Sequence, residues 1–483
     1  MNHKLKQLSK DTAIYGISTI LGRFLNFLLV PFYTYVFGRA EYGIVANIYS
    51  FIALLNIIYL YGFDVAFLRY STNENIQTQK KYYSTAFLTV FFTSIIFSIF
   101  IFFTYEKYID FIGITKDYSN LIIYMVIILF LDSLSAIPFT NLRIQRKAKI
   151  FASYKFINIL TNVIFNIVFI FFLKYGIEAV LISNILASFI TLILLLVDIS
   201  KFFNLTYDKD ALKKFLKFGI AFVPAGLASM VVQVIDRPIL QKLTNSDVVG
   251  LYQANYKLGI FMMLFVSVFQ YAWQPFLIAN SKEKDSKDII SKVLTYFLIL
   301  GSVILISLTF LIYPLTTTKI FGKSLINYNY WSGLYIVPIV LLGYLFNGVY
   351  VVLSAGILIK EKTFLAPVIT GLGALVNVIS NLLLIPRYSI LGAAFSTFFS
   401  YFVMSFGMFI ANQHYYHIKF EYLKIIKIFF LIGIFLSLYY KFYNLFITNI
   451  LLEILAILVF ILAIFIFKIL KINAILNMKK GII

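Results

Sequence analysis

The sequence predicts an all-α polytopic membrane protein with about fourteen transmembrane helices. Hydrophobic residues make up 61% of its 483 residues and charged residues 13%, whereas about a quarter of a soluble domain is charged. Apolar runs of roughly twenty residues, long enough to cross a bilayer, alternate with short polar breaks. Lysine and arginine concentrate in every second break, which is the pattern of the positive-inside rule. Together these observations exclude an ordinary soluble domain.

Each helix is placed by the length of an apolar run and by the polar residues that end it. The first run follows a basic tail and lacks the small-residue cleavage site of a signal peptide, so we expect it to remain as a helix. The expected helices span residues 11–37, 42–70, 83–104, 119–143, 151–173, 176–200, 215–242, 248–280, 289–314, 331–356, 363–385, 390–412, 422–441 and 447–471.

The basic residues set the expected topology. With the N-terminus in the cytoplasm, and with basic residues near the helix ends counted with the adjoining loop, the inner tails and loops hold 29 of the 41 lysines and arginines and the outer loops hold 9; Arg23, Arg237 and Lys257 remain within helices. Because a missed helix would scramble this asymmetry, we expect both termini in the cytoplasm. The short basic loops also explain the net charge of +21, and no nucleic-acid partner is expected.

The chain carries an internal repeat. Pro31 is followed twelve residues later by Gly43, and Pro238 is followed twelve residues later by Gly250, each time across a helix, a turn and a helix. The repeat predicts two related halves in the same order along the chain. Transporters built from parallel repeats hold their substrate between the halves.

A second match links residues 162–179 with 377–392. We therefore expect two six-helix lobes related by a pseudo-two-fold repeat, followed by two additional helices. The expected domains are an N-terminal lobe at 1–200, a cytoplasmic linker at 201–214, a C-terminal lobe at 215–412, and the C-terminal helices with their tail at 413–483.

Charged residues within the apolar runs are the candidates for function. Arg23 lies near the middle of the first helix, where a charge costs about 2.5–3.5 kcal/mol on insertion scales and so faces protein or a water-filled cavity. Asp236 and Lys257 are expected at similar depth in neighbouring helices and to pair, which would leave Arg237 free. Asp64 is expected to pair with another charge. For Arg23 and Arg237, structural ion pairing is the alternative to facing a functional cavity.

Amide side chains gather in the seventh and eighth helices, where they favour a polar cavity over a packed core. These amides can form hydrogen bonds either between helices or to sugar hydroxyls, and the sequence does not distinguish the two roles. The candidate substrate-binding residues are Arg23, Arg237, Lys257, Asp64, Asp236, Gln253, Asn255, Gln270 and Gln274.

The residue types that carry covalent or metal chemistry are scarce. Cysteine is absent, and His3, His414 and His417 lie in a tail and a loop, so no thiolate or histidine metal site is expected. No Walker motif is present. We expect neither a catalytic residue nor a cofactor, and a coupling ion, H⁺ or Na⁺, is left open.

Several motifs resemble those of the Wzx-type polysaccharide biosynthesis proteins, the oligosaccharide-lipid flippases of the multidrug/oligosaccharidyl-lipid/polysaccharide exporter (MOP) superfamily. They are Asp11-Thr-Ala, Gly22-Arg-Phe, the run from Gly38 to Gly43, and the run from Asn377 to Tyr388. The resemblance implies alternating access that moves a polyprenyl-diphosphate-linked oligosaccharide to the outer leaflet of a bacterial cytoplasmic membrane, with a polysaccharide polymerase as a further partner. It also implies a cationic cavity, for which Arg23 and Arg237 are candidates without a residue-for-residue match.

Two other functions compete with this interpretation. A multidrug or cation antiporter of the same superfamily would want an acidic site, whereas the first helix offers Arg23, and arginine matches diphosphate bidentately. A membrane-embedded glycan polymerase or ligase would need catalytic groups on a large outer loop, and the longest outer loops are 105–118 and 315–330. An inside-negative potential favours export of an anion by about 2.3 kcal/mol per charge per 100 mV.

Overall fold

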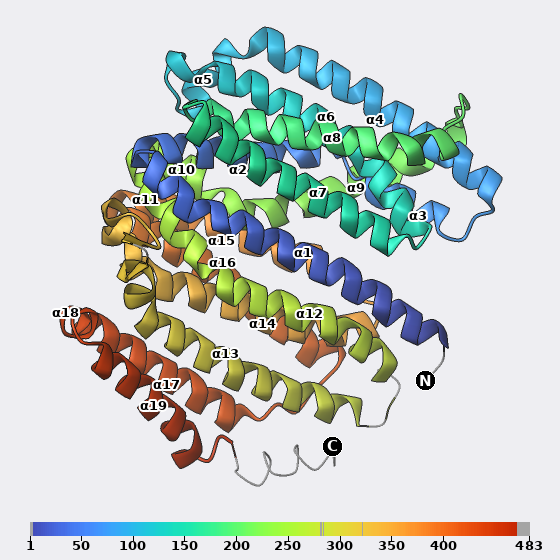
Figure 1. The fold of residues 1–483 in the computed structure, drawn as a ribbon. Coiled ribbons are helices and arrows are strands. Elements are labelled where there is room, and N and C mark those ends of the chain that lie inside the picture. Colours follow the sequence, from blue (N-terminus) through green and yellow to red (C-terminus); the bar gives the residue numbers. More distant parts are fainter. Residues whose placement is uncertain (1–2, 281–282, 284, 321, 471–483) are drawn as a thin grey trace. The chain divides into compact units, whose positions relative to one another are not determined.

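The computed structural model describes residues 3–280, 283, 285–320 and 322–470, and Figure 1 shows that they are almost entirely helical. Within these residues, twelve helical segments are long and apolar enough to cross a membrane. Two shorter apolar helices, Ile20–Val36 and Ile450–Ile466, add to them. Each of the fourteen predicted helices overlaps one of these segments, which confirms the predicted fold class.

The chain divides into two compact units, described separately below. The first contains the described parts of residues 1–254 and residues 373–396. Its elements are α1 (His3–Val36), α2 (Arg39–Leu60), α3 (Phe63–Ser71), α4 (Ile76–Thr104), α5 (Glu106–Ile112), η1 (Lys116–Tyr118), α6 (Asn120–Ile144), α7 (Ala148–Ile167), η2 (Val168–Phe172), α8 (Glu178–Phe202), α9 (Lys209–Val234), α10 (Asp236–Leu243), most of α11 (Ser246–Tyr256), and parts of α15 (Leu365–Tyr388) and α16 (Ile390–Tyr415).

Helix α6 forms the centre of the first unit. It packs against α2, α4 and α8, while α7 packs against α1 and α8. The span that contains α6 has 67% of its residues buried, compared with 11% for the span that contains α7. Few residues of α7 are therefore fully buried.

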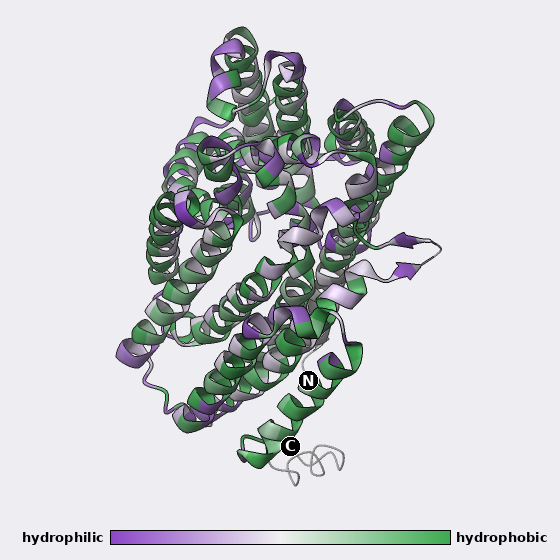
Figure 2. Ribbon diagram, turned by 90° about the vertical axis from the view of Figure 1, so that its left-hand side faces the viewer, coloured by the Kyte–Doolittle hydropathy of each residue, from purple (hydrophilic) through white to green (hydrophobic). Residues whose placement is uncertain are grey.

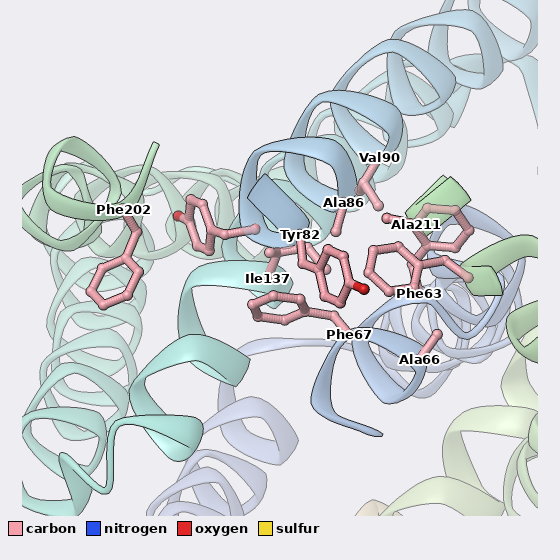
Figure 3. Close-up of a cluster of buried hydrophobic side chains, with 11 residues drawn as sticks. Phe63, Ala66, Phe67, Tyr82, Ala86, Val90, Ile137, Phe202 and Ala211 are labelled. Atoms are coloured by element: carbon pink, nitrogen blue, oxygen red, sulfur yellow. The ribbon is translucent and has the colours of Figure 1, made fainter. Parts of the chain in front are cut away.

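An aromatic core lies where α3, α4, α8 and α9 meet (Figure 3). Phe63 and Phe67 of α3 are fully buried, and Tyr82 of α4 lies close to both of them (Figure 3). Phe215 of α9 inserts beside them, with its ring centroid 5.6 Å from that of Tyr82 and 5.8 Å from that of Phe63. This packing fixes the first turns of α9 to α3 and α4.

The second predicted helix, 42–70, is broken into α2 and α3. The break falls at Tyr61 and Gly62, whose φ angles are +33° and +77°, a region that glycine enters at little cost. A side chain at Gly62 would also lie 2.6 Å from the carbonyl oxygen of Gly219 in α9. Glycine therefore allows both the turn and the close approach of the two backbones.

The seventh predicted helix, 215–242, is also broken, into α9 and α10. Pro238 explains the position of the break, because proline has no N–H group and its ring clashes with the carbonyl four residues earlier. Helix α9 ends at that residue, Val234. The outer loop predicted at 105–118 differs as well, because it contains the short helix α5.

The second unit contains the described parts of residues 255–372 and 397–470. Its elements are the last residues of α11, η3 (Lys257–Gly259), α12 (Ile260–Asn280), α13 (Ser286–Thr317), β1 (Lys319–Ile320), β2 (Lys323–Ser324), η4 (Tyr328–Ile336), α14 (Val337–Ile359), the remaining parts of α15 and α16, α17 (Tyr422–Lys441), α18 (Tyr443–Ile447) and α19 (Ile450–Ile466).

Helix α14 is the core of the second unit, because 78% of its span is buried. It packs against α12 and α13, and α13 in turn contacts α17 and α19. The predicted additional helices are thus attached through α13, where Phe310 meets Tyr439 with a ring-centroid distance of 5.4 Å. Strands β1 and β2 form a small antiparallel hairpin that projects from the helices as hydrophilic arrows in Figure 2. The boundaries of the predicted lobes stay a prediction.

Candidate substrate-binding site

A buried ion pair occupies the junction between α9 and α10. The side chains of Asp236 and Arg237 are 2% and 6% exposed, and the guanidinium Nη1 lies 2.6 Å from the carboxylate Oδ1. Arg237 also donates to the Gln253 side chain at 3.0 Å and to the Gln233 carbonyl at 2.6 Å. The second carboxylate oxygen of Asp236 accepts a hydrogen bond from the Tyr252 hydroxyl. The junction is therefore a closed polar network.

The prediction that Asp236 leaves Arg237 free was wrong. Side chains at consecutive positions diverge on a continuous helix, but Asp236 is the first residue of α10, directly after the break caused by Pro238. There its carboxylate also accepts the backbone N–H of Arg237 at 3.0 Å. Both carboxylate oxygens are thus taken by Arg237 and Tyr252, and Lys257 is not the partner that Asp236 uses.

Arg23 lies on a face of α1 that the first unit leaves uncovered. Its neighbour Gly22 is buried against α7, where a side chain would come within 2.7 Å of Ile159. Further along the same packed side, the Tyr33 hydroxyl donates to Asn166 of α7 at 2.8 Å. The Arg23 side chain is exposed. An exposed arginine this deep in a span is costly in lipid, and a water-filled cavity removes that cost.

Helix α7 carries a polar face that the sequence reasoning missed. Lys155, Asn158, Asn162 and Asn166 follow one another at intervals of three, four and four residues, which places them on one side of a helix. The Lys155 ammonium lies 4.2 Å from the centre of the Phe139 ring. From the sequence, Lys155 is counted with the basic loop before the predicted helix 151–173, near whose start it lies, whereas the structure places it seven residues into α7.

Asp132 of α6 supplies the acidic member of this region. Its carboxylate accepts a hydrogen bond from Ser188 of α8 at 2.7 Å and interacts electrostatically with Lys155. Lys155 lies one helical turn before Ile159, the residue that meets α1 beside Arg23. Two cations of the first unit, Arg23 and Lys155, therefore lie at a similar level on adjacent helices.

Asp64 and Arg69 occupy opposite ends of the short helix α3. Asp64 accepts the backbone N–H of Val65 and interacts electrostatically with Arg143. Arg69 instead stacks over the Phe218 ring of α9, with its guanidinium carbon 4.5 Å from the ring centre. Cation–π stacking of this kind anchors a side chain, so Arg69 helps to hold α9 against α3.

The remaining candidates differ in their exposure. The Asn255 side chain is fully buried and donates to the Tyr330 carbonyl at 2.9 Å, which is a structural role within the second unit. Lys257 and Gln270 are half-buried, and Gln274 is exposed. Substrate binding by any of these residues stays a prediction. Among the residues that the structure describes, no group of His, Asp and Glu could hold a metal ion.

The first turns of α2 and α11 cross so closely that their backbones touch. A side chain at Gly43 would lie 1.8 Å from the Ser246 carbonyl oxygen, and one at Gly250 would lie 1.8 Å from the Arg39 carbonyl oxygen. Arg39 and Asp247 add a bidentate ion pair with both contacts at 3.1 Å. We call Arg39, Gly43, Asp247 and Gly250 the clasp. Gly43 and Gly250 are also the equivalent positions of the predicted repeat.

The second match of the repeat has the same local geometry in both copies. Asn166 donates to the carbonyl and side-chain oxygens of Asn162, at 2.8 and 3.1 Å. Asn381 donates in the same way to Asn377, at 2.9 and 2.8 Å. Equivalent residues thus make equivalent contacts in both copies.

Comparison with known sequences shows two relationships. Residues 8–281 match the family model described as Polysaccharide biosynthesis protein. An uncharacterized membrane protein of Methanocaldococcus jannaschii is 25% identical over an alignment that covers 97% of this chain and 98% of that protein. The alignment therefore spans nearly the full length of both chains.

Solved structures share the fold over most of the chain. The lipid II flippase MurJ in an inward closed conformation superposes with a TM-score of 0.74 and 17% identity, covering 93% of this chain and 98% of that chain. The Vibrio cholerae MATE transporter VcmN gives a TM-score of 0.60 with 11% identity, covering 86% and 98%. A MOP superfamily transporter from Pyrococcus furiosus gives 0.62 with 12% identity and the same coverage.

Proposed function

We propose that this chain, which belongs to the polysaccharide biosynthesis protein family, moves a polyprenyl-diphosphate-linked oligosaccharide from the inner to the outer leaflet of a bacterial cytoplasmic membrane. The family match over residues 8–281 carries this proposal, since it covers most of the first unit. The chain is a multi-pass membrane protein, and its fold is also that of a lipid II flippase. The protein would bind and move its cargo without covalent chemistry, with both termini in the cytoplasm.

The charges of the first unit support an anionic cargo. Arg23 of α1 and Lys155 of α7 are exposed on membrane-spanning helices, and a diphosphate is the headgroup that an arginine binds bidentately. Asp132 interacts electrostatically with Lys155, so the charge of that lysine is partly balanced within the first unit. We therefore assign the diphosphate to Arg23 and place Lys155 in a supporting role.

Arg237 is better suited to positioning helices than to binding the headgroup. It is buried and bonded to Asp236, Gln253 and the carbonyl of Gln233. Breaking a buried pair to bind substrate would expose an uncompensated charge, which costs about 3–5 kcal/mol. On the polar face of α7, Asn166 is fully buried and bonded to Tyr33, which leaves the half-buried Asn158 and Asn162 to offer hydrogen bonds to the sugar hydroxyls.

Alternating access requires part of the closed structure to separate. At Gly43 and Gly250 the clasp is a contact between backbones, so these two residues have no side chains to unpack when it parts. The Arg39–Asp247 ion pair is only half-buried, and solvent-accessible ion pairs contribute about 0–1 kcal/mol. Both features support the clasp as a gate that opens while cargo is released.

The function is tested by leaflet-resolved analysis of the cargo. Deletion of the gene in cells that still assemble the glycan should leave lipid-linked oligosaccharide with complete repeat units on the cytoplasmic leaflet. Arg23→Ala should reproduce the defect at normal protein level, and Arg23→Lys should restore part of the export, because an ammonium lacks the bidentate fork. Arg146→Ala, in the exposed turn between α6 and α7, is the matched control and should export normally.

Two results would replace the proposal. Accumulation of an incomplete repeat unit would indicate an enzyme of glycan assembly. Unchanged glycan export with loss of resistance to cationic drugs would indicate an antiporter.

A further inference from the structure

The first unit holds an apolar pocket that the proposed transport does not use. It lies between α2, α4, α5 and α6 and has a volume of about 280 Å³. Its floor is formed by Tyr59, Ile112 and Met125, which are all at most 3% exposed. Phe100 and Phe111 line its mouth and are 60% and 65% exposed.

The lining of the pocket offers no polar group for a polar ligand. Of its two tyrosine hydroxyls, that of Tyr59 is bonded to Ser98 at 3.2 Å, and that of Tyr108 accepts a long hydrogen bond from Thr104 at 3.5 Å. Apolar cavities of about 150 Å³ stay dry and admit hydrocarbon molecules. A larger pocket with the same kind of lining is therefore expected to hold hydrocarbon and to exclude water.

The surroundings of the mouth identify the source of that hydrocarbon. Ile96, Ile99 and Phe103 of α4 continue the exposed apolar surface around Phe100. Both α2 and α4 are membrane spans, so this surface faces lipid chains in the bilayer. The chain that enters the pocket thus comes directly from the membrane.

The charges on α5 distinguish between the lipids that could supply the chain. Its exposed positions next to the mouth carry Glu106, Lys107 and Asp110, two acids and one base. The diphosphate of the transported lipid would be repelled by the net negative charge. A zwitterionic aminophospholipid fits this set, because its ammonium can meet an acid and its phosphate can meet Lys107.

We propose that this pocket binds one acyl chain of a zwitterionic aminophospholipid, with the headgroup against α5. The site is separate from the charged residues assigned to the cargo. Bound there, the lipid fills the space between α2 and α4 and supports the helix that carries Arg39 and Gly43 of the clasp.

Tryptophan fluorescence with brominated lipids tests the site in the purified full-length protein in detergent. Phe100→Trp places a reporter at the mouth. Phe92→Trp is the matched control, because Phe92 lies on the same helix, is 58% exposed and does not line the pocket. The parent protein, which contains Trp273 and Trp331, provides the background signal.

Dibrominated phosphatidylethanolamine should quench Phe100→Trp saturably, at about one lipid per protein, and should quench Phe92→Trp only in proportion to its concentration. The double variant Leu55→Phe/Phe100→Trp, in which the larger side chain narrows the pocket, should lose the saturable part of the quenching. Its melting temperature should stay within a few degrees of that of Phe100→Trp. If both reporters are quenched equally and the quenching does not saturate, the proposed site is wrong. Displacement by undecaprenyl phosphate at equal concentration, or tighter binding of brominated phosphatidylglycerol, would overturn the assignment to a zwitterionic lipid.

Discussion

At the scale of single residues, Asp236 and Arg237 form an ion pair in the interior of the protein. Both side chains are almost completely buried. Removing one partner leaves an uncompensated charge, so Asp236→Ala should lower the free energy of unfolding by about 3–5 kcal/mol. Thermal unfolding in detergent measures the loss.

The double variant Asp236→Leu/Arg237→Met is the control for this pair. Replacing both charges with apolar groups of similar volume is often neutral or stabilising, so it should recover most of the loss. If the stability losses of the two single variants simply add up in the double variant, the two residues do not act as a pair.

Glu453 of α19 is a second buried charge. Its side chain is 1% exposed, and its Oε2 has no hydrogen-bond partner in the part of the chain that the structure describes. Because an ionised carboxylate pays a large desolvation cost there, Glu453→Gln should unfold at the same or a higher temperature, as measured by differential scanning fluorimetry. A melting temperature several degrees lower would show that the protein needs the acid at this position.

At the scale of elements, glycine sets the distance between α2 and α11. Gly250→Ala would bring a methyl group to 1.8 Å from the Arg39 carbonyl oxygen, so the helices must separate and the melting temperature should fall by several degrees. Gly371→Ala is the matched control, since nothing lies within 4 Å of its added methyl group. That control should be neutral or stabilising by about 0.5–1 kcal/mol, because alanine favours a helix over glycine. Equal effects at both positions would contradict the close crossing.

The clasp can also be locked by a disulfide. The chain contains no cysteine, so Arg39→Cys/Asp247→Cys forms a single defined pair. Oxidation should stop glycan export and reduction should restore it, provided that the clasp opens during transport. The two single variants should export normally under oxidising conditions. Full export by the oxidised double variant, with the cross-link verified by gel mobility, would exclude the clasp as a gate.

At the scale of the whole molecule, topology is the property most open to direct measurement. Single cysteines at Lys323 in the hairpin and Lys360 after α14 should react with a membrane-impermeant maleimide from opposite sides. Lys323→Cys should label in intact cells, and Lys360→Cys should label only after permeabilisation, because one span separates them. Labelling of both in intact cells would contradict the predicted register.

The sequence alone determined the number and approximate position of the membrane spans. Hydropathy and run length are local properties of the chain, and lipid requires every span to satisfy its backbone polar groups internally. The same local reasoning found the glycines of the repeat. It also selected Arg23, which the structure leaves exposed on α1; that it faces a cavity stays a prediction.

Only the tertiary structure decided how the charged residues are used. Asp236 binds Arg237 because Pro238 ends α9 at Val234 and frees the helix start for this contact. Lys155 entered the candidate site because the fold brings it beside Phe139 and Asp132 of α6. Partners of this kind depend on helix breaks and on helices distant in sequence. A buried charge must find some partner, but the fold determines which one.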